Sequence, residues 1–441
     1  MPVRLLLPAF LALSALAVPA GVAADERDYE PGEVIVKYED DADARATSAA
    51  ARLSGRDTER ALPGGSEKLA IEDGDSVRET IAELNRDPNV AYAVPNWKAR
   101  AAAFIPNDPA FRRQWNLFDL FGINMPEAWE LAAARGAPGG AGAVVAVLDS
   151  GVAYERYGRY RRAPDLRAST FVKGRDLIDR DGHPNDEYGH GTHVAGTIAQ
   201  ATNNGVATAG IAYGAKIMPL RVLDSFGEGD SAAIARAIRY AARRGVDVIN
   251  LSLEFPANVR ATEIPHVLSA LRFARRHGSV VVAAAGNRAG TAVAYPARAE
   301  QVMAVGATTI TGCEADYSNA GKDLDVVAPG GGIDAPNPRS QWDLDHCRPE
   351  NPSRPIIQQT FTNDGWVRSF GLRGPLYEGT SMAAPHVAAI AALVIGSGRL
   401  GPNPSPRLVE NHIKATSRDA GDVGFDPFYG HGIVDAAAAL R

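Results

Sequence analysis

Short apolar runs alternate with longer amphipathic stretches along most of the chain after residue 104. Such runs are typical of strands buried on both faces, whereas apolar residues spaced three and four apart are typical of helices. Strands that alternate with helices predict an α/β fold, mainly a parallel sheet with helices on both faces. Strands are predicted at 144–151, 216–223, 246–253, 279–287, 301–307 and 324–330, and helices at 192–201, 230–245 and 264–278.

The pattern in residues 25–103 is different. Short pieces in the order strand, helix, strand, helix, strand predict a small α+β unit of ferredoxin-like type. The predicted strands are 33–38, 68–72 and 90–96, and the predicted helices cover about 42–53 and 76–86.

Acidic residues are concentrated in this N-terminal unit. Residues 25–103 contain 18 Asp and Glu against 11 Lys and Arg, a net charge of −7, whereas the whole chain carries −6. Residues 104–441 are therefore close to neutral, and nothing in the chain is basic enough to predict nucleic-acid binding.

Residues 1–24 precede both units and have the features of a secretory signal peptide. Arg4 is followed by the apolar run LLLPAFLALSALAV and by small residues, which predicts cleavage after Ala23 or Ala24. A membrane anchor is the alternative, but the apolar run is too short to span a bilayer and is interrupted at Pro19. The mature protein is therefore expected outside the cytoplasm, with no membrane segment.

The chain contains two cysteines, Cys313 and Cys347. In an exported protein a bridge between them can form, and it would contribute roughly 3–4 kcal/mol in the chain-entropy model. Spacing alone also allows two free thiols. A catalytic cysteine is the least favoured interpretation, because neither residue lies in a nucleophile-like context.

Four polar residues stand at predicted strand ends or helix starts. Taken singly, each has an ordinary structural role, such as helix N-cap or turn residue. Serine acyl transfer, however, needs a nucleophile, a base, a group that orients the base and donors for the oxyanion. The carboxyl ends of parallel strands are also where the chemistry of such sheets gathers. The four residues are Asp149, His190, Asn287 and Ser381.

His193 follows His190 by three residues, so a metal-binding pair is an alternative. No Glu stands between the two histidines, unlike the HExxH arrangement, and no third ligand is evident. A packed or capping role is the better interpretation for His193.

The segments DSG, GHGTHVAGTIA, AAAGN and GTSMAAPHVA carry the four residues in this order. These segments resemble the sequence blocks of subtilisin-like serine peptidases (subtilases), and the resemblance covers about 104–441. It implies that Asp149 orients His190, which serves as general base and then general acid. It also implies that Ser381 attacks the scissile carbonyl, while the Ser381 backbone N–H and the Asn287 side chain hold the oxyanion.

A less specific resemblance extends to residues 25–103, where EVIVKY and VAYAVPN are similar to the ends of the family's propeptide. In the family this segment is an inhibitor and folding assistant that the enzyme itself removes. The resemblance implies a cleaved bond within 100–104. The predicted parts are thus a signal peptide, 1–24, a propeptide, 25–103, and a catalytic domain, 104–441, with an insertion at 331–376.

Subtilases often bind calcium through ligands from three separated segments, and Asp108, Asp165 and Asn204 match that pattern. Oxygen ligands suit a hard cation. Surface aspartates and a turn asparagine are the alternative interpretation. The resemblance implies a structural calcium ion and no organic cofactor.

The sequence departs from the family at two places. The strand that lines the substrate cleft usually reads Ser-Leu-Gly but here is Ser252-Leu253-Glu254, so Glu254 is predicted to narrow the cleft or to attract a basic side chain. The segment 331–376 is rich in Pro, Gly and Asp and longer than the family's usual connection. It is expected either as a lid or subsite wall pinned by the cysteines, or as a surface loop.

These observations predict a secreted, monomeric serine endopeptidase made as a self-processing zymogen. Its expected partners are polypeptide substrates and its own propeptide, with no nucleic acid and no membrane. An inactive binding scaffold is one alternative, which labelling by a serine-directed phosphonate would distinguish. An esterase is another, which relative rates on matched ester and amide substrates would distinguish.

Overall fold

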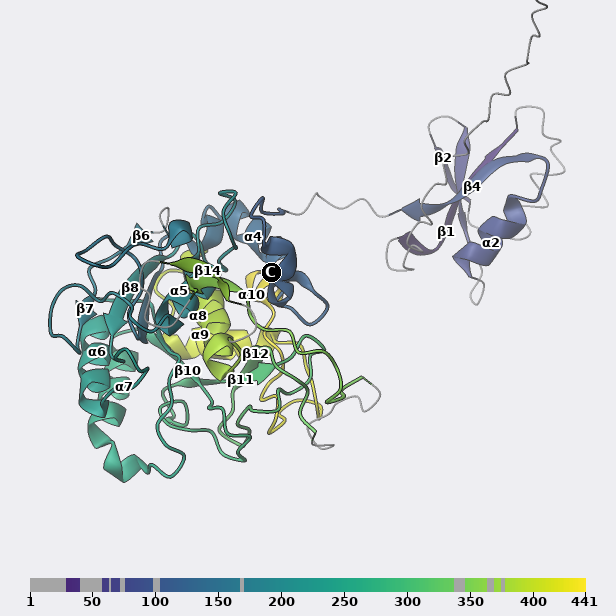
Figure 1. Cartoon of the computed structure of the whole chain (residues 1–441). Coiled ribbons are helices and arrows are strands. Elements are labelled where there is room, and N and C mark those ends of the chain that lie inside the picture. The colour runs from purple at the N-terminus through teal and green to yellow at the C-terminus, as the bar shows by residue number, and fades with distance from the viewer. Residues whose placement is uncertain are drawn as a thin grey trace, which may run out of the picture. The chain divides into compact units, whose positions relative to one another are not determined.

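The computed structural model describes residues 29–39, 58–62, 65–71, 76–97, 104–166, 170–336, 346–362, 369–373 and 377–441. The chain divides into two compact units, Met1–Ala102 and Ala103–Arg441 (Figure 1). The predicted signal peptide, the helix predicted at about 42–53 and residues 100–103 of the predicted cleavage region lie outside the described residues.

The first unit contains an antiparallel sheet in the order β2-β3-β1-β4. Helix α2 begins after Ser76, whose hydroxyl accepts a hydrogen bond from the Glu79 N–H at 3.4 Å as an N-cap. Strand β2 was not predicted, because its sequence TERAL carries no run of β-branched residues. The elements are β1 (Tyr29–Tyr38), β2 (Thr58–Leu62), β3 (Ser66–Ala70), α2 (Val77–Leu84) and β4 (Val90–Trp97).

The second unit contains a parallel sheet in the order β12-β11-β10-β9-β5-β8-β6, and β7 also pairs with β8. Every pair among these strands is parallel. The predicted α/β fold is therefore confirmed. The strands are β5 (Val144–Asp149), β6 (Thr170–Phe171), β7 (Arg175–Asp176), β8 (Lys216–Arg221), β9 (Val248–Leu251), β10 (Val280–Ala284), β11 (Met303–Thr308) and β12 (Val326–Pro329).

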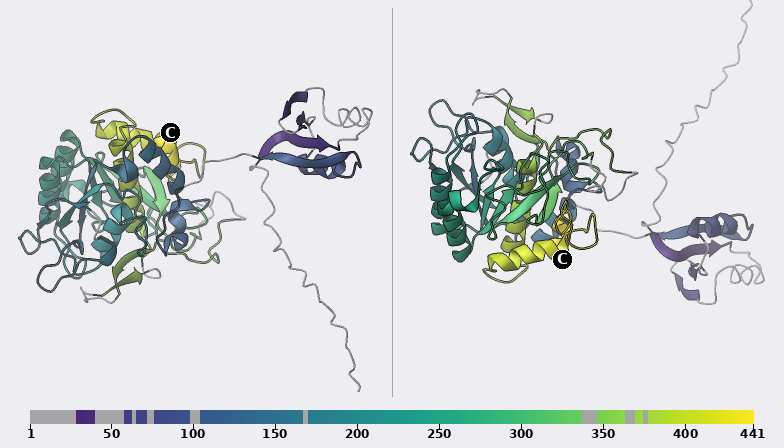
Figure 2. Two further views of the ribbon diagram at one scale, coloured as in Figure 1. Left: turned by 90° about the horizontal axis from the view of Figure 1, so that it is seen from above. Right: turned by 90° about the horizontal axis from the view of Figure 1, so that it is seen from below.

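Helices cover both faces of this sheet (Figure 1 and Figure 2). Successive side chains of a strand point to opposite faces. Along β5, Val145 and Val147 therefore pack into the core cluster that contains α5 and α8, whereas Ala146 and Leu148 pack into the cluster that contains α6 and α7. The principal helices are α5 (His190–Ala199), α6 (Ser231–Arg243), α7 (Pro265–Arg276) and α8 (Thr380–Gly396).

Shorter helices and a hairpin complete the unit. They are η2 (Phe111–Arg113), α3 (Trp115–Phe118), α4 (Met125–Ala134), η3 (Pro138–Gly140), η4 (Pro164–Leu166), η5 (Ala261–Glu263), β13 (Gln358–Phe361), β14 (Phe370–Arg373), α9 (Pro406–Thr416) and α10 (Ala436–Leu440).

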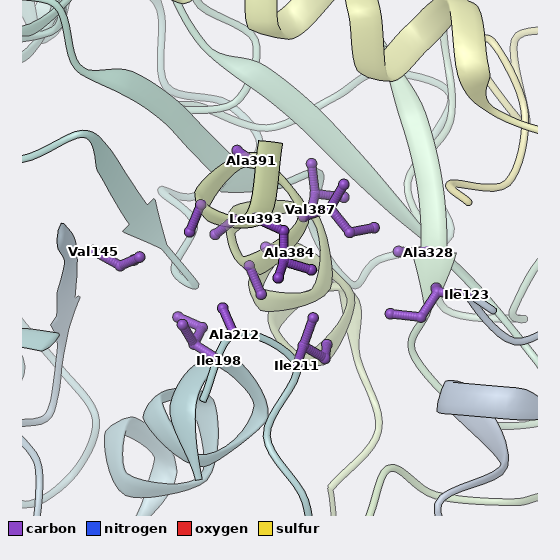
Figure 3. Close-up of a cluster of buried hydrophobic side chains, with 14 of the residues drawn as sticks. Ile123, Val145, Ile198, Ile211, Ala212, Ala328, Ala384, Val387, Ala391 and Leu393 are labelled. Carbon is purple, nitrogen blue, oxygen red and sulfur yellow. The ribbon is translucent and has the colours of Figure 1, made fainter. Parts of the chain in front are cut away.

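Helix α8 is enclosed by the core. Fourteen of its 17 residues are buried, so the helix is apolar on all sides, as expected where every face packs against protein. Figure 3 shows Ala384, Val387, Ala391 and Leu393 of α8 among side chains of α5, β5 and β12. Small alanine side chains allow the helix to lie close to its neighbours, and the start of α8 is thereby held at a fixed place.

The order of the strands reverses at β5. Strands β8 and β6 lie on one side of β5, and β9 to β12 lie on the other. In parallel sheets a crevice forms at the carboxyl ends of the strands where the order reverses. Asp149 ends β5, and Ser252 follows β9 at the same edge.

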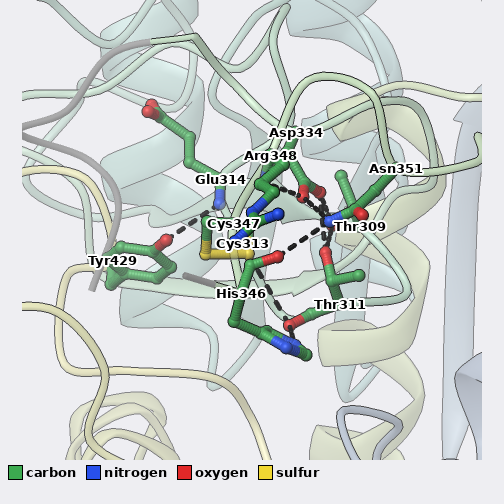
Figure 4. Close-up of a disulfide and its surroundings, with 10 residues drawn as sticks. All are labelled: Thr309, Thr311, Cys313, Glu314, Asp334, His346, Cys347, Arg348, Asn351 and Tyr429. Atoms are coloured by element: carbon green, nitrogen blue, oxygen red, sulfur yellow. Dashed lines mark hydrogen bonds between the residues drawn. A yellow bond between two sulfur atoms is a disulfide. The ribbon is translucent and has the colours of Figure 1, made fainter. Parts of the chain in front are cut away.

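The irregular segment predicted at 331–376 is fastened to the body of the unit where it is described. Cys313 and Cys347 form a disulfide (Figure 4). Buried Asp334 accepts four hydrogen bonds, which come from Thr309 Oγ1 (2.6 Å), Thr311 Oγ1 (2.7 Å), the Arg348 N–H (2.9 Å) and Asn351 Nδ2 (2.8 Å).

Further along this segment, β13 and β14 form an antiparallel hairpin. Gln359 Oε1 accepts the Asp165 N–H at 3.0 Å, and the Thr360 hydroxyl donates to the carbonyl oxygen of Gly189. This part of the segment is therefore a docked structural element.

Candidate active site

Asp149 and His190 are joined by a hydrogen bond of 2.7 Å between Asp149 Oδ1 and His190 Nδ1. Asp149 is the last residue of β5 and is fully buried, and His190 is the first residue of α5. The residue after His190 is Gly191. A Cβ atom there would collide with the Gly151 carbonyl oxygen, so this glycine allows the start of α5 to approach the residues after β5 closely. Because Nδ1 is engaged, Nε2 is the ring nitrogen available to another group.

Two carboxylates act on the titration of His190. Burial opposes the imidazolium and lowers the pKa of His190, but the charge and hydrogen bond of Asp149, with the charge of Asp186, outweigh burial. The pKa of His190 is therefore raised above its ordinary value.

Asp186 was not singled out in the sequence, yet it lies buried behind this pair. No motif in the turn before α5 indicated Asp186, although an acidic side chain a few residues before a helix is a capping signal. Burial raises the pKa of Asp186, but its five bonding partners are all donors, which suits an ionised carboxylate. They are Ser150 Oγ (2.8 Å), the N–H groups of Tyr188 (2.9 Å), Gly189 (2.8 Å) and Thr192 (2.9 Å), and Thr192 Oγ1 (2.6 Å).

Ser381 is the second residue of α8 and hydrogen-bonds with Ser252 in both directions. The Ser381 hydroxyl donates to the Ser252 carbonyl at 3.2 Å, and the Ser252 hydroxyl donates to the Ser381 carbonyl at 2.8 Å. Pro385, four residues later in the helix, has no N–H for that carbonyl. Pro385 lies beyond the first turn of α8, and the Ser252 hydroxyl supplies the donor that the proline lacks.

Asn287 contacts the start of the same helix. Its Oδ1 accepts hydrogen bonds from Thr380 N–H at 2.8 Å and from Thr380 Oγ1 at 2.9 Å. These bonds fix the carboxamide with its carbonyl end toward Thr380, which leaves the NH₂ end for another acceptor.

An open groove of about 680 Å³ brings these residues together. The described residues of the segment 331–376 are absent from its lining, so the part of that segment which the structure describes forms neither a lid nor a wall of this groove. The groove is lined by His190, Ser381, Asn287, Ser252, Leu253 and Glu254, together with neighbouring residues.

Glu254 carries a negative charge at this groove that the protein offsets only weakly. Its side chain is 24% exposed, and Arg288 Nε lies 3.7 Å from its Oε1. Its Oε2 accepts the Asn287 N–H at 3.3 Å. Both contacts are long, so Glu254 retains the capacity to pair with a cation.

The three candidate calcium ligands also converge. Asp108 accepts hydrogen bonds from the N–H groups of Asn203 (2.7 Å) and Asn204 (3.1 Å). Asn204 Nδ2 lies 2.9 Å from Asp165 Oδ1. Burial, with a smaller contribution from the charge of Asp108, raises the pKa of Asp165 to about 6.

Two carboxylates close to one amide in a buried place fit a cation, because a cation would offset both charges. Among the described residues, no group of three or more His, Cys, Asp or Glu side chains is arranged to hold a metal ion. A site here would therefore depend on backbone oxygens and on the Asn204 carboxamide oxygen, which accepts the Val206 N–H at 2.8 Å in this structure and would have to turn toward the cation.

His193 is buried, and its Nε2 lies 3.0 Å from the Ile356 carbonyl oxygen. Its ring stacks on Tyr377 at 4.4 Å, and burial lowers the pKa of His193 to about 3. These contacts are those of a packed, neutral histidine, as the sequence favoured.

The chain matches two known protein families. Residues 140–432 match the model of the subtilase family, and residues 17–96 match the model described as the fervidolysin N-terminal prodomain. The chain belongs to the subtilase family. It is a serine endopeptidase with a prodomain.

Relatives match over most of the chain. A thermophilic serine proteinase from Bacillus sp. (strain AK1) is 35% identical over 381 residues, covering 86% of this chain and 81% of that protein. Thermitase from Thermoactinomyces vulgaris is 34% identical over 341 residues, covering 77% and 100%.

Solved structures agree in fold. A protease of Pseudoalteromonas arctica PAMC 21717 has a TM-score of 0.62 and 34% identity, covering 76% of this chain and 98% of that one. A lanthipeptide protease has a TM-score of 0.56 and 26% identity, covering 77% and 99%. In the part of the chain that the structure describes, no helix is long and apolar enough to cross a membrane.

Proposed function

We propose that Asp149, His190 and Ser381 are the catalytic triad of this endopeptidase and that the chain is a secreted, self-processing zymogen. The observation that carries the proposal is the 2.7 Å hydrogen bond from buried Asp149 to His190, whose side chain lines the same groove as Ser381. Catalysis requires the Ser381 hydroxyl to exchange its present acceptor, the Ser252 carbonyl, for Nε2 of His190.

In the proposed reaction, His190 takes the proton of Ser381 while Oγ attacks the scissile carbonyl carbon. Asp149 stabilises the imidazolium, which then protonates the leaving amine as the peptide C–N bond breaks. Water, deprotonated by the same imidazole, releases the acyl group. The Ser381 N–H and Asn287 Nδ2 donate to the oxyanion, and loss of one such donor typically lowers kcat about 10²–10³-fold.

The substrate peptide would pair as an added strand along Ser252-Leu253-Glu254, which gives broad recognition of the main chain. Calcium would be held by Asp108, Asp165 and Asn204, and would neutralise the two carboxylates and stabilise the fold. No organic cofactor takes part. The prodomain acts as inhibitor until it is removed, and the enzyme is a monomer.

Glu254 gives this groove a preference for a basic side chain near the cleaved bond. We expect wild type to cleave peptides with Arg there about two- to fivefold better than matched peptides with Leu, because a partly exposed ion pair contributes up to about 1 kcal/mol. In Glu254→Gln the preference should disappear. The matched control is Glu228→Gln, which removes another carboxylate from the same groove. Equal kcat/KM for both peptides in wild type would refute the preference.

Self-processing tests the function itself. Residues 25–441 are produced as wild type and as Ser381→Ala, and intact masses and N-termini are followed over time. Cleavage within 100–104 in wild type alone supports the nucleophile, the propeptide and the peptidase activity together. If neither protein is cut, self-processing is refuted and the chain is inactive or matured by another enzyme. If both are cut equally, another protease is responsible.

A further inference from the structure

A second groove, of about 550 Å³, lies between α6 and the turn that follows β7. Arginines dominate its lining. The β7 side contributes Arg175 and Arg180, and α6 contributes Arg236, Arg239 and Arg243. None of these residues lines the groove of the candidate active site.

The helix pattern brings three of the arginines together. Positions 236, 239 and 243 are three and four residues apart, so they lie on one face of α6. The opposite face of α6 is apolar and packs into the core through residues such as Ile234 and Ile238. The arginine face is therefore the solvent face. Arg175 of β7 and Arg180 of the turn after β7 add two further guanidinium groups to the groove.

In the described part of the protein, none of the five arginines of this groove forms a salt bridge, and neither α6 nor α7 contains an acidic residue. Asp176 is the one carboxylate among the described lining residues, and it is engaged at 3.0 Å by buried Arg221, which also pairs with Asp179 and Glu187. The whole chain carries a net charge of −6, so a generally basic composition does not explain the cluster.

Three of the guanidinium groups are held in place. Arg239 Nη2 donates to Ser269 Oγ at 2.8 Å, and the Arg239 guanidinium lies 4.9 Å from the centre of the Phe273 ring. Arg243 lies over the same ring at 5.8 Å, and Arg175 lies over Tyr240 at 6.0 Å. Stacking fixes the plane of a guanidinium and leaves N–H donors free, so these groups are prepared for an anion at little further cost in entropy.

We propose that this arginine groove binds an anion that carries two or more phosphate groups, either free or as a headgroup. Guanidinium groups pair with phosphate oxygens in a bidentate way, and five of them exceed what one phosphate can satisfy. Binding of single-stranded nucleic acid depends on open aromatic faces. Here the ring of Tyr240 lies beneath Arg175 and, at 5.0 Å, Arg244, which favours phosphate alone.

The test uses the full chain carrying Ser381→Ala, which removes proteolysis from the assay. Tripolyphosphate is titrated calorimetrically, and sedimentation is measured with phosphatidylcholine vesicles that contain or lack lipid A, a lipid with two phosphates. The variant is Arg236→Gln with Arg243→Gln. The matched control is Arg272→Gln with Arg276→Gln, two exposed arginines of α7 outside the groove.

We expect tripolyphosphate to bind with one site per chain. The groove variant should bind at least about tenfold more weakly, roughly the loss of one or two charge-assisted contacts, and the α7 variant within about twofold of the parent. Sedimentation with lipid A vesicles would identify a headgroup as the source, whereas binding of tripolyphosphate alone would identify a free anion.

Three results would overturn the proposal. These are binding of neither probe, equal weakening in the α7 variant, or an oligonucleotide that binds more tightly than tripolyphosphate at the same salt concentration. The four substituted side chains are exposed, so the variants should fold, and unchanged circular dichroism verifies this. Because proteolysis is not measured, the outcome is independent of the proposed catalytic triad and of self-processing.

Discussion

Asp186 connects the two residues of the proposed triad that lie nearest to it. It accepts hydrogen bonds from Ser150, which follows Asp149, and from Gly189 and Thr192, which flank His190. Without contacting substrate it therefore fixes the end of β5 against the start of α5. We regard it as a positioning residue that also contributes charge.

The substitution Asp186→Asn should move the acidic limb of the pH profile of kcat/KM to lower pH. His190 must be neutral to act as a base, and the charge of Asp186 helps to raise the pKa of His190. Removal of that charge lowers this pKa, so activity persists further into acid even where kcat itself falls. The measured quantity is the pH midpoint of the acidic limb, which a purely structural loss of activity would not lower.

Asp181→Asn is the control, because it removes an exposed carboxylate from the same loop. An unchanged limb in Asp186→Asn, or an equal shift in the control, would contradict the charge effect.

Among individual residues, the sequence indicated Asp149, His190, Asn287 and Ser381, because each lies in a contiguous segment at a strand end or helix start. Asp186 and the relation between Ser252 and Pro385 were not predicted. They depend on which carbonyl lacks a donor and which carboxylate is enclosed, and the spacing of residues along one segment does not contain that information.

Among the elements, long buried strands and helices were predictable and short polar strands were not. β5 and β10 are runs of apolar residues buried on both faces, so their own composition specifies them. β13, with the sequence QQTF, is a strand because β14 and α5 flank it. The pairing of β13 depends on tertiary contacts, which the local sequence pattern does not predict.

The disulfide should stabilise the catalytic unit without influencing substrate affinity. Replacing Cys313 and Cys347 by Ser is expected to lower the free energy of unfolding by about 3–4 kcal/mol, since the bridge closes a loop of 34 residues. Guanidinium denaturation of the Ser381→Ala protein, with and without the two cysteine substitutions, measures this loss of stability. KM of the otherwise wild-type enzyme should stay within about twofold, because the described part of the segment does not line the groove.

A KM changed tenfold or more would show that the segment shapes the groove after all. A stability loss below about 1 kcal/mol would mean that the hydrogen bonds of Asp334 hold the loop without the bridge.

For the molecule as a whole, calcium should raise the thermal midpoint of the Ser381→Ala protein relative to chelator, and more so at about pH 8 than at about pH 5. Burial raises the pKa of Asp165 to about 6 in the folded state. A carboxyl group whose pKa is higher in the folded state than in the unfolded state stabilises the fold below its unfolded pKa. This stabilisation is lost as pH rises through the folded pKa. The cation offsets that loss only where Asp165 is ionised.

Asp165→Asn should abolish most of the calcium increment, whereas Asp181→Asn should preserve it. A midpoint that does not respond to calcium at either pH would remove the proposed site.

The proposed catalytic groups come from parts of the chain that are far apart in sequence. Asp149 and His190 are 41 residues apart, and the bonded pair Ser252 and Ser381 are 129 apart. Such contacts form late, because parallel sheets close long loops before any contact compensates for the lost entropy. A chain still folding therefore has no complete site, and it gains proteolytic capacity only after the end of β5 and the starts of α5 and α8 have come together.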